Sequence, residues 1–341
     1  MPIRAPSGHT GPIPRPFHEL ILEKVKEHAR DRSRVAFVCA ETGEEMTFGR
    51  VLVLTTKVAT YLNEMGFKKG ESALLCLPNC LEYMPIVLGV CSRGGVSSGT
   101  NPTYTEYEIA KQMKDCGCSI AFTIGPLLDT VVKAAAQNKK NVKIVCLKPP
   151  AGKPLPKGVV SFDEILKCAP DFDLPKVKFD AAKDLAILPY SSGTTGAPKG
   201  VMLTHQNIST MTVVGAKSLH DTYHMLDWAH GPQLNFLPMF HAYGFMLALF
   251  LLVHGSKFII MAKFDPGVFL KAVQDFKIRL IQIVPPIALF LAKHPIVDKF
   301  DFSSVEYVIC GAAPLGKDLC DAMMARHPNL KFISQGAFGI L

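Results

Sequence analysis

Leu185-Ala-Ile-Leu-Pro-Tyr190 leads into Ser191-Ser-Gly-Thr-Thr-Gly-Ala-Pro-Lys199-Gly200, and Val201-Met-Leu-Thr-His205 follows. An apolar strand thus feeds a loop that is rich in glycine and hydroxyl side chains. Glycine lets a backbone turn tightly and point its amide N–H groups at an anion, hydroxyls donate further hydrogen bonds, and a lysine adds a positive charge. The loop is therefore predicted to clamp phosphate groups, through Ser191, Ser192, Gly193, Thr194, Thr195, Gly196, Lys199 and Gly200.

This loop differs from the phosphate-binding loop of the mononucleotide NTPases. That motif ends in Gly-Lys followed by Ser or Thr, whereas here Pro198 precedes Lys199 and Gly200 follows it. An ordinary loop of serine, glycine and threonine is the alternative interpretation. Ten defined positions directly after an apolar strand favour a ligand site over that alternative.

Helix and strand patterns alternate along the chain outside this loop. Apolar residues at helical spacing or in short buried runs predict helices over 17–25, 47–65, 80–92 and 106–115, and strands over 35–38, 72–77, 94–96, 120–123 and 141–147. The window 245–253 is wholly apolar, but a membrane span needs about twenty such residues, so a buried helix is expected there. The alternation predicts an α/β fold.

The chain is expected to consist of a lead and one large domain in two parts. Residues 1–16 are rich in proline and polar residues and are predicted to be a flexible lead, with the domain over 17–341. Lysine, proline and glycine dominate 148–160. A soft internal boundary is therefore predicted at 148–184, before a second strand–loop–helix series begins near Leu185.

The composition is that of a folded protein with small anionic ligands. Of the 341 residues 48% are hydrophobic and 19% are charged, and the formal charge is +8. The densest basic stretch, 139–157, contains prolines and no aromatic residue on which a base could stack, so nucleic acid is not an expected partner. Nucleotides and phosphorylated cofactors fit the positive charge better.

The cysteines and the N-terminus indicate a reducing compartment. Ten cysteines are scattered over the chain, several within apolar runs such as 75–77 and 308–310, where they are expected to be buried. Cys116-Gly117-Cys118 lacks the second pair that a zinc site needs. Residues 1–15 contain no apolar stretch that could form the core of a signal peptide, so secretion is not expected.

Residues 190–205 closely resemble the signature loop of the adenylate-forming superfamily, which includes acyl-CoA synthetases, 4-coumarate–CoA ligases and beetle luciferases. The resemblance runs from about Phe17 to Gln335. It implies the large N-terminal domain of the adenylate-forming fold, with two packed αβαβα subdomains whose sheets are mixed and mostly parallel. Three further segments carry it: Asn101-Pro-Thr-Tyr-Thr105 with Glu108-Ile109 after it, Leu237-Pro-Met-Phe-His241, and Gly311-Ala-Ala-Pro-Leu315.

The resemblance implies a reaction in which a carboxylate attacks the α-phosphate of ATP. The products are an acyl-adenylate and pyrophosphate, and the thiol of coenzyme A (CoA) then displaces AMP; Mg²⁺ accompanies the ATP. Such chemistry depends on positioning and charge stabilisation, which suits a clamp that steadies the leaving pyrophosphate. By resemblance this clamp consists of Ser191, Ser192, Gly193, Thr194, Thr195, Gly196 and Lys199, with Lys199 and Thr194 counted as catalytic.

His241 and Tyr243 are assigned to the reaction centre by the same resemblance. From pattern alone His241 fits a core histidine as well as a functional one. In the family the corresponding histidine lies where the carboxylate meets the α-phosphate, so His241 is counted as catalytic. In the family the residue two positions further on, Tyr243 here, faces the acyl group.

A second segment is expected to bind the adenine. Gly311, Ala312 and Ala313 are small enough for a flat base to lie against the backbone, with Gly311 also bordering the acyl pocket and Gln335 on the nucleotide side. A plain Gly-Ala turn before a helix, whose start Pro314 would favour, is the alternative interpretation.

The sequence departs from the family pattern in two places. Cys310 replaces a serine of the plant-type ligases, an exchange between small residues that we expect to be tolerated. The family continues Gln-Gly-Tyr-Gly-x-Thr-Glu, with the Thr on phosphate and the Glu on magnesium, but here Gln335-Gly336 is followed by Ala337-Phe338-Gly339-Ile340-Leu341. A C-terminal lid domain is therefore not expected, and a fragment, a splice-type variant or an intron read-through would each give this ending.

Three hypotheses about function follow. The first is an ATP-dependent acid–CoA ligase for a fatty or aromatic carboxylic acid, impaired in this form. The second is a pseudoenzyme that binds nucleotide or acyl ligand without turnover. The third is peripheral membrane contact through 234–253, which Pro238, His241 and Gly244 interrupt. A cytoplasmic location is expected, because Gly339-Ile340-Leu341 is not a peroxisomal address; a peroxisomal location is an alternative for a full-length relative.

Overall fold

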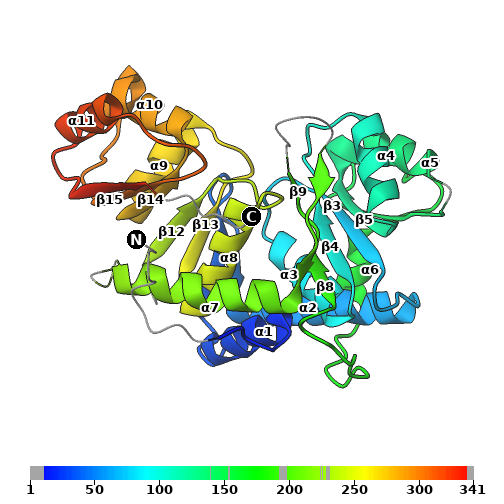
Figure 1. Ribbon diagram of the computed structural model, residues 1–341. Helices are drawn as coiled ribbons and strands as arrows, with labels where there is room; N and C mark the ends of the chain where they lie inside the picture. The colour runs from blue at the N-terminus through cyan, green and yellow to red at the C-terminus, as the bar shows by residue number, and fades with distance from the viewer. Residues whose placement is uncertain are drawn as a thin grey trace.

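The computed structural model describes residues 11–138, 140–152, 154–191, 198–222, 224, 226–227 and 231–335. Figure 1 shows two lobes side by side, with α4 (Glu106–Asp115) and α5 (Leu128–Ala136) in one and α10 (Pro285–Lys293) and α11 (Lys317–Arg326) in the other. Helices and mostly parallel strands alternate through both lobes. The α/β fold predicted from the sequence is confirmed.

A seven-stranded sheet forms the first lobe, in the order β11-β8-β4-β3-β5-β6-β7. Its neighbouring strands are parallel except β11 and β8. Helices cover both faces, which is why Leu75 of β3 is buried against α2 and α3 while Leu74 is buried towards α4 and α5. The strands are β3 (Ser72–Cys76), β4 (Val96–Gly99), β5 (Cys118–Ile124), β6 (Lys143–Leu147), β7 (Val159–Ser161), β8 (Leu185–Ile187) and β11 (Leu203–Thr204); the further helices are α2 (Phe48–Glu64), α3 (Tyr83–Ser92), α6 (Phe162–Lys167) and the short 3₁₀ turn η1 (Gly125–Leu127).

The second lobe contains a four-stranded sheet, β12-β13-β1-β2, and a three-stranded parallel sheet, β14-β15-β16, whose first strand lies beside β12. Helices α1, α7 and α8 pack together against one face of the four-stranded sheet, and α9 packs against the other (Figure 1). The remaining elements are α1 (Phe17–His28), β1 (Val35–Cys39), β2 (Glu45–Thr47), α7 (His205–Thr222), β12 (Pro232–Asn235), α8 (Ala242–His254), β13 (Lys257–Ile260), α9 (Pro266–Phe276), β14 (Leu280–Ile283), η2 (Pro295–Lys299), β15 (Tyr307–Cys310) and β16 (Phe332–Gln335).

Each lobe contains strands from both sides of residues 148–184 in the sequence. Strands β1 and β2 precede this segment but lie in the second lobe, where β1 pairs with β13. Strands β8 and β11 follow it but complete the seven-stranded sheet of the first lobe. The predicted boundary at 148–184 therefore does not coincide with the division between the sheets. The reason is that strands on opposite sides of this segment pair with each other, as β1 does with β13 and β4 with β8.

Helix α8 confirms the buried helix predicted for 245–253. All its residues from Tyr243 to Leu252 are buried. It ends at Gly255, whose φ of 75° lies in the left-handed region that glycine adopts without strain. No helix within the described ranges is long and apolar enough to cross a membrane.

The cysteines are free thiols in the described chain. Cys76 and Cys310 are buried, as predicted from their apolar runs. Burial raises the pKa of the Cys76 thiol to about 12 and that of Cys310 to about 11, so both are neutral small side chains at physiological pH.

Two buried histidines meet where α1 and α7 pack together. His18 and His205 are 4% and 0% exposed, with ring centroids 5.3 Å apart, and Phe179 lies 4.9 Å from each of them. Nδ1 of His18 and both ring nitrogens of His205 have no hydrogen-bond partner among the described residues. Burial lowers the pKa of His18 to about 3 and that of His205 to about 4, so both rings are held neutral.

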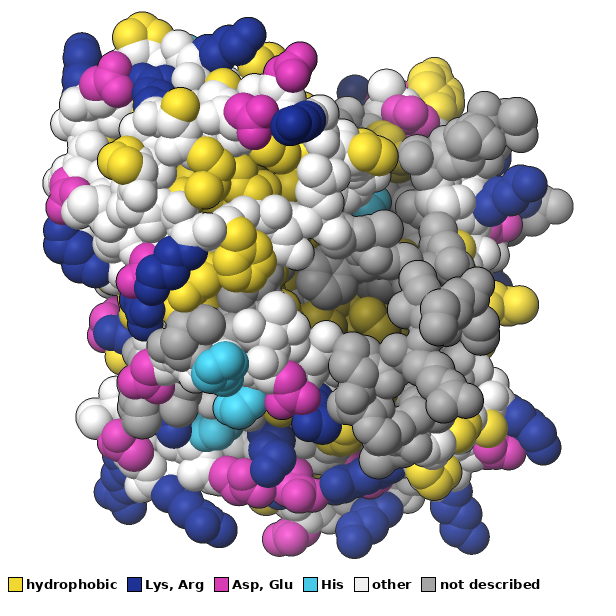
Figure 2. All heavy atoms as spheres, turned by 60° about the vertical axis from the view of Figure 1, so that its left-hand side comes forward, with side chains coloured by type: hydrophobic (Ala, Val, Ile, Leu, Met, Phe, Trp, Pro, Cys, Tyr) yellow, Lys and Arg dark blue, Asp and Glu magenta, His cyan; other side chains and the backbone are white. Residues whose placement is uncertain are grey.

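The surface mixes charges of both signs. Figure 2 shows Lys and Arg side chains interspersed with Asp and Glu on the face that carries the three-stranded sheet. On this lobe Lys271 pairs with Asp275, and Lys277 with Asp301. Among the described residues visible on this face, the basic side chains are separated by acidic ones and do not form a continuous stripe.

Candidate functional site

The predicted phosphate loop is closed at its base by a small hairpin. Ser191 in β9 (Tyr190–Ser191) pairs antiparallel with Lys199 in β10 (Lys199–Gly200), and Tyr190 pairs with Gly200. Lys199 is exposed beside Ser191, at the rim of the loop. The remaining predicted loop residues lie outside the described residues: Ser192, Gly193, Thr194, Thr195 and Gly196.

Tyr190 anchors this hairpin to α4. Its hydroxyl donates a hydrogen bond of 2.5 Å to Oδ2 of Asp115, the last residue of α4. Its ring also covers Gly200, where an added Cβ would lie 3.1 Å from a ring carbon. Burial and the Asp115 carboxylate both raise the pKa of Tyr190, so the phenol remains a donor. The base of the loop therefore has a fixed position relative to the seven-stranded sheet.

Replacing Tyr190 by Phe tests this anchor. The variant keeps the ring over Gly200 but loses the hydrogen bond to Asp115. We expect the free energy of unfolding to fall by about 1 kcal/mol, since hydrogen bonds to charged groups are worth somewhat more than neutral ones and this pair is partly solvated. Urea denaturation measures the change. Tyr107→Phe is the control, because the Tyr107 side chain is 71% exposed; equal losses in the two variants would contradict the anchor.

His241 caps the N-terminus of α8. Its backbone is extended, with φ −99° and ψ 146°, and its Nδ1 accepts a long hydrogen bond, 3.5 Å, from the backbone N–H of Tyr243. One side of the ring faces apolar neighbours while more than a third of the residue remains exposed. This partial burial lowers the pKa of His241 below its ordinary value. The neutral imidazole therefore dominates at neutral pH.

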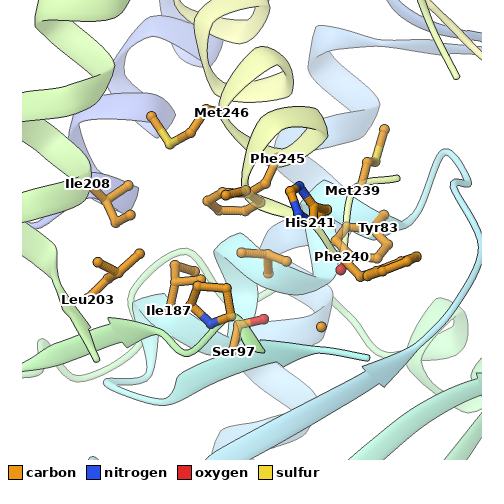
Figure 3. A pocket seen from close by; sticks show the side chains of 14 residues that line it. Tyr83, Ser97, Ile187, Leu203, Ile208, Met239, Phe240, His241, Phe245 and Met246 are labelled. Atoms are coloured by element: carbon orange, nitrogen blue, oxygen red, sulfur yellow. The ribbon is translucent and has the colours of Figure 1, made fainter. Parts of the chain in front are cut away.

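An apolar pocket lies beside His241, as Figure 3 shows. Its space, including the open mouth, is about 400 Å³. It is a slot between the lobes. Its wall includes Pro189, Phe240 and His241. The hairpin at the base of the phosphate loop begins at Tyr190, directly after Pro189, so the structure brings this base and His241 to the same pocket.

Tyr243 and Gly311 do not line this pocket, which meets the first turn of α8 through Ala242 and Phe245. Tyr243 is instead buried in the hydrophobic cluster that contains Cys310 and Leu315. These two residues flank the Gly311–Pro314 segment. Neither of the two predicted acyl-side residues, Tyr243 and Gly311, therefore lies on the wall of this pocket.

The predicted adenine segment forms a strained turn after β15. The backbone N–H of Gly311 donates to the Ile283 carbonyl at 3.0 Å, and Ala312 has a φ of 71°. A left-handed conformation costs a residue with a Cβ roughly 1–3 kcal/mol, and such strain gathers at ligand sites. Ala312 and Ala313 are exposed there. Helix α11 begins at Lys317, three residues after Pro314, so a plain turn before a helix stays the alternative interpretation of this segment.

Gln335 supports this turn from the neighbouring strand. Its Nε2 donates to the Leu315 carbonyl at 2.9 Å, and its Oε1 accepts from the Leu315 N–H at 3.1 Å. Both ends of the amide are therefore occupied by one backbone unit. A direct contact between Gln335 and a nucleotide stays a prediction.

Sequence reasoning missed three residues that shape the site. Asp115 anchors Tyr190, Gly99 lies against Phe240, and Asn79 binds the loop that carries His241. One signal was available for Asn79. It lies three residues after a buried parallel strand, and polar residues at the carboxyl ends of such strands commonly belong to sites.

The sequence profile of the family described as "AMP-binding enzyme" matches residues 24–337. The chain belongs to this family of AMP-binding enzymes. The resemblance drawn from the motifs around Lys199, His241 and Gly311 is thereby confirmed at the level of the family.

Among AMP-binding enzymes, curated relatives include 4-coumarate–CoA ligases of plants. The chain is 38% identical over 322 residues to 4-coumarate–CoA ligase 2 of Petroselinum crispum and 34% identical over 322 residues to 4-coumarate–CoA ligase 1 of Solanum tuberosum. Each alignment covers 94% of this chain and 56% of the relative. The chain thus spans about half the length of the curated relatives it matches.

Solved structures of AMP-binding enzymes and similar proteins share the fold. The red-emitting luciferase of Phrixothrix hirtus superposes with a TM-score of 0.83 at 24% identity, covering 95% of this chain and 61% of that protein. The inhibitor-bound N-terminal domain of FACL13 from Mycobacterium tuberculosis gives 0.77 at 24% identity, covering 93% and 75%. The implied architecture, the N-terminal domain of adenylate-forming enzymes, is therefore confirmed.

Proposed function

We propose that this chain carries the ATP-handling part of an acid–CoA ligase. The reaction joins a carboxylate to the α-phosphate of ATP, releasing pyrophosphate, and the thiol of CoA then replaces AMP. The observation that carries the proposal is the closed hairpin that presents Lys199 at the rim of the family's signature loop. Family membership and the names of the plant relatives support it.

The proposed phosphate clamp acts on the β- and γ-phosphates. Lys199 contributes a positive charge to the leaving pyrophosphate, and Ser191, Ser192, Thr194 and Thr195 donate hydroxyl hydrogen bonds. Gly193 and Gly196 let the backbone approach the phosphates. Because the loop is rooted by Tyr190 and Asp115, little reordering of its base would accompany binding.

His241 is proposed to act as a neutral group at the junction of carboxylate and α-phosphate. Its depressed pKa keeps the ring uncharged, so it can donate or accept one hydrogen bond without attracting the carboxylate into an ion pair. Tyr243 is proposed to face the acyl group, with Gly311 at the border of the acyl and adenine sides. Ala312, Ala313 and Gln335 complete the proposed nucleotide side.

Magnesium is proposed to arrive with ATP. The described residues contain no group of three or more His, Cys, Asp or Glu side chains that could hold a metal ion. Mg²⁺ commonly keeps several waters and binds through substrate phosphates with only one or two carboxylates, so a protein cage is not required. The acid substrate is proposed to be a fatty or aromatic carboxylic acid.

A second candidate function is binding without turnover. In the family pattern the Thr and Glu that serve phosphate and magnesium would fall at Ile340 and Leu341. Neither side chain can donate a hydrogen bond or ligate a cation. This observation favours a chain that holds nucleotide or acyl ligand and does not complete the reaction.

Two measurements on the purified chain separate these candidates. The first is calorimetric binding of ATP with Mg²⁺, and the second is pyrophosphate release with a panel of fatty acids and hydroxycinnamates. Acid-dependent release supports the ligase, and ATP binding without release supports the second candidate. If the chain neither binds ATP nor releases pyrophosphate, both candidate functions are refuted.

Lys199→Ala provides the residue-level test of the clamp. We expect its dissociation constant for ATP to rise about 10- to 100-fold, since a charge-assisted hydrogen bond to phosphate is worth about 1.5–3 kcal/mol. Lys183→Ala is the matched control, because the Lys183 side chain is also exposed and lies just before the same strand series. Equal affinities for wild type and Lys199→Ala would refute the proposed role of Lys199.

A further inference from the structure

Asn79 connects the two lobes at the base of the loop that carries His241. It lies just after β3, at the carboxyl edge of the seven-stranded sheet, and is 5% exposed. Its Nδ2 donates to the carbonyls of Leu237 at 3.0 Å and Met261 at 3.1 Å, and its Oδ1 accepts from the N–H of Met239 at 2.8 Å. All three partners belong to the second lobe.

These bonds fix the orientation of the Asn79 amide. Both N–H groups point at carbonyl oxygens and the oxygen meets an N–H, so the flipped amide would place like groups against each other at every contact. Each buried polar group left without a partner costs about 1–3 kcal/mol. The loop 237–239 is therefore held in one register against β3.

A second contact seats the same loop on β4. A Cβ added to Gly99 would lie 2.6 Å from the Tyr83 hydroxyl and 2.8 Å from Cα of Phe240. Figure 3 shows Phe240 and Tyr83 side by side beneath His241. Only a residue without a side chain admits Phe240 so close to the strand. The residue before His241 thus rests directly on the first lobe.

We propose that Asn79 is a positioning residue for His241: it fixes where the imidazole lies relative to the hairpin of β9 and β10 on the first lobe. The loop between Asn79 and the ring is short: Met239 is bonded to Asn79, and His241 N–H donates to the Pro238 carbonyl at 3.1 Å. The phosphate loop is rooted on the same lobe as Asn79. Through Asn79, His241 is held by the same lobe that holds the base of the phosphate loop. The proposal rests on the proposed function in one respect, the role of His241 in the reaction.

The test follows the His241 ring itself by NMR, with ¹³Cε1-labelled histidine in the full chain and assignment by His241→Gln. In wild type the ring titrates below the ordinary range, because apolar neighbours lower its pKa. In Asn79→Ala we expect the resonance to move and the pKa to rise towards the ordinary value, because a released loop exposes the ring to water. Where the chain releases pyrophosphate, kcat should fall about 10- to 100-fold with the ATP dissociation constant unchanged.

Asn329→Ala is the matched control. Asn329 also bonds two carbonyls through Nδ2, those of Phe302 and Val305, but neither it nor these partners line the pocket beside His241. It should lower stability and leave the His241 titration unchanged. An unchanged titration in Asn79→Ala, or equal shifts in both variants, overturns the proposal.

Asn79→Ser replaces Asn79→Ala if the latter does not fold, because a hydroxyl with water fills part of the space. Failure of both to fold beside a folded Asn329→Ala would make Asn79 a folding residue and overturn the positioning role. The NMR readout needs no turnover. A chain that is inactive but shows the expected titration shift would contradict the ligase function and leave the positioning of His241 supported.

Discussion

Lowering the pH from 7 to 4 is expected to remove on the order of 5 kcal/mol from the free energy of unfolding, through His18 and His205 alone. In the folded chain these rings titrate at about 3 and about 4, whereas in the unfolded chain both take the ordinary value near 6.5. Below pH 6.5 these two histidines therefore bind protons in the unfolded state but stay neutral in the folded state. Stability is complete above this pH and is lost as the pH falls towards the folded values.

The charged groups near the two rings give little stabilisation to their protonated forms. His18 faces His205 and Arg15, both unfavourable to a positive charge. His205 faces Asp184, which favours protonation, and Lys69, which opposes it. Since Lys69 itself pairs with Asp184 at 2.6 Å, little negative charge is left for His205.

Urea denaturation at pH 7, 5.5 and 4 measures this loss. His205→Phe should flatten the dependence, because a phenyl ring fills the same stacked site against Phe17 without a titrating group. The control is His224→Gln, at an exposed position. A pH slope in His205→Phe as steep as in wild type would show that other groups cause the acid sensitivity.

Gly244→Ala is expected to destabilise the fold by on the order of 3 kcal/mol. A Cβ at this position would lie 2.4 Å from the carbonyl oxygen of Pro238 and 2.5 Å from that of Leu237. Both are backbone atoms, and the Leu237 oxygen is already bonded to Asn79. Relief therefore requires the His241 loop to move away from α8, which should also lower any pyrophosphate release.

Gly267→Ala is the matched control, since Gly267 also lies in the first turn of a helix, α9. A Cβ there would meet only Oδ1 of Asp265, at an ordinary 3.4 Å. Helix propensity alone predicts that this variant is up to about 1 kcal/mol more stable. Thermal and urea denaturation compare the pair; a mild effect of Gly244→Ala, similar to that of Gly267→Ala, would show that the loop adapts easily.

Most helices and strands of the first lobe could be predicted, because helix caps and hydrophobic runs within each segment mark them. Thr47 caps α2 by accepting from the N–H of Arg50, and the capping box of Thr105 and Glu108 starts α4 at the predicted residue. Hydrophobic runs sufficed for β3 and β5, which are buried on both faces. Helix α5 was missed, since its short alanine-rich sequence has a weak start signal.

The pairing of strands could not be predicted in the same way. Nothing in the residues of β1 distinguishes a partner nearby from β13 far along the chain, because both are short apolar strands. Likewise Asn79 is a single polar residue whose three partners come from two distant loops. The family motifs located the hairpin, His241 and the Gly311 turn, but the contacts that hold them depend on the packing of the lobes.

The pairing of β1 with β13 has a consequence for synthesis of the chain. Their paired residues, such as Phe37 and Phe258, are more than two hundred positions apart. A ribosome that adds roughly 5–20 residues per second needs about ten to forty seconds to make the intervening stretch. During that interval β1 and β2 form at most a lone hairpin with an open edge, which invites pairing with other chains. The edge of β1 that later receives β13 therefore stays unpaired for most of the time in which the chain is synthesised.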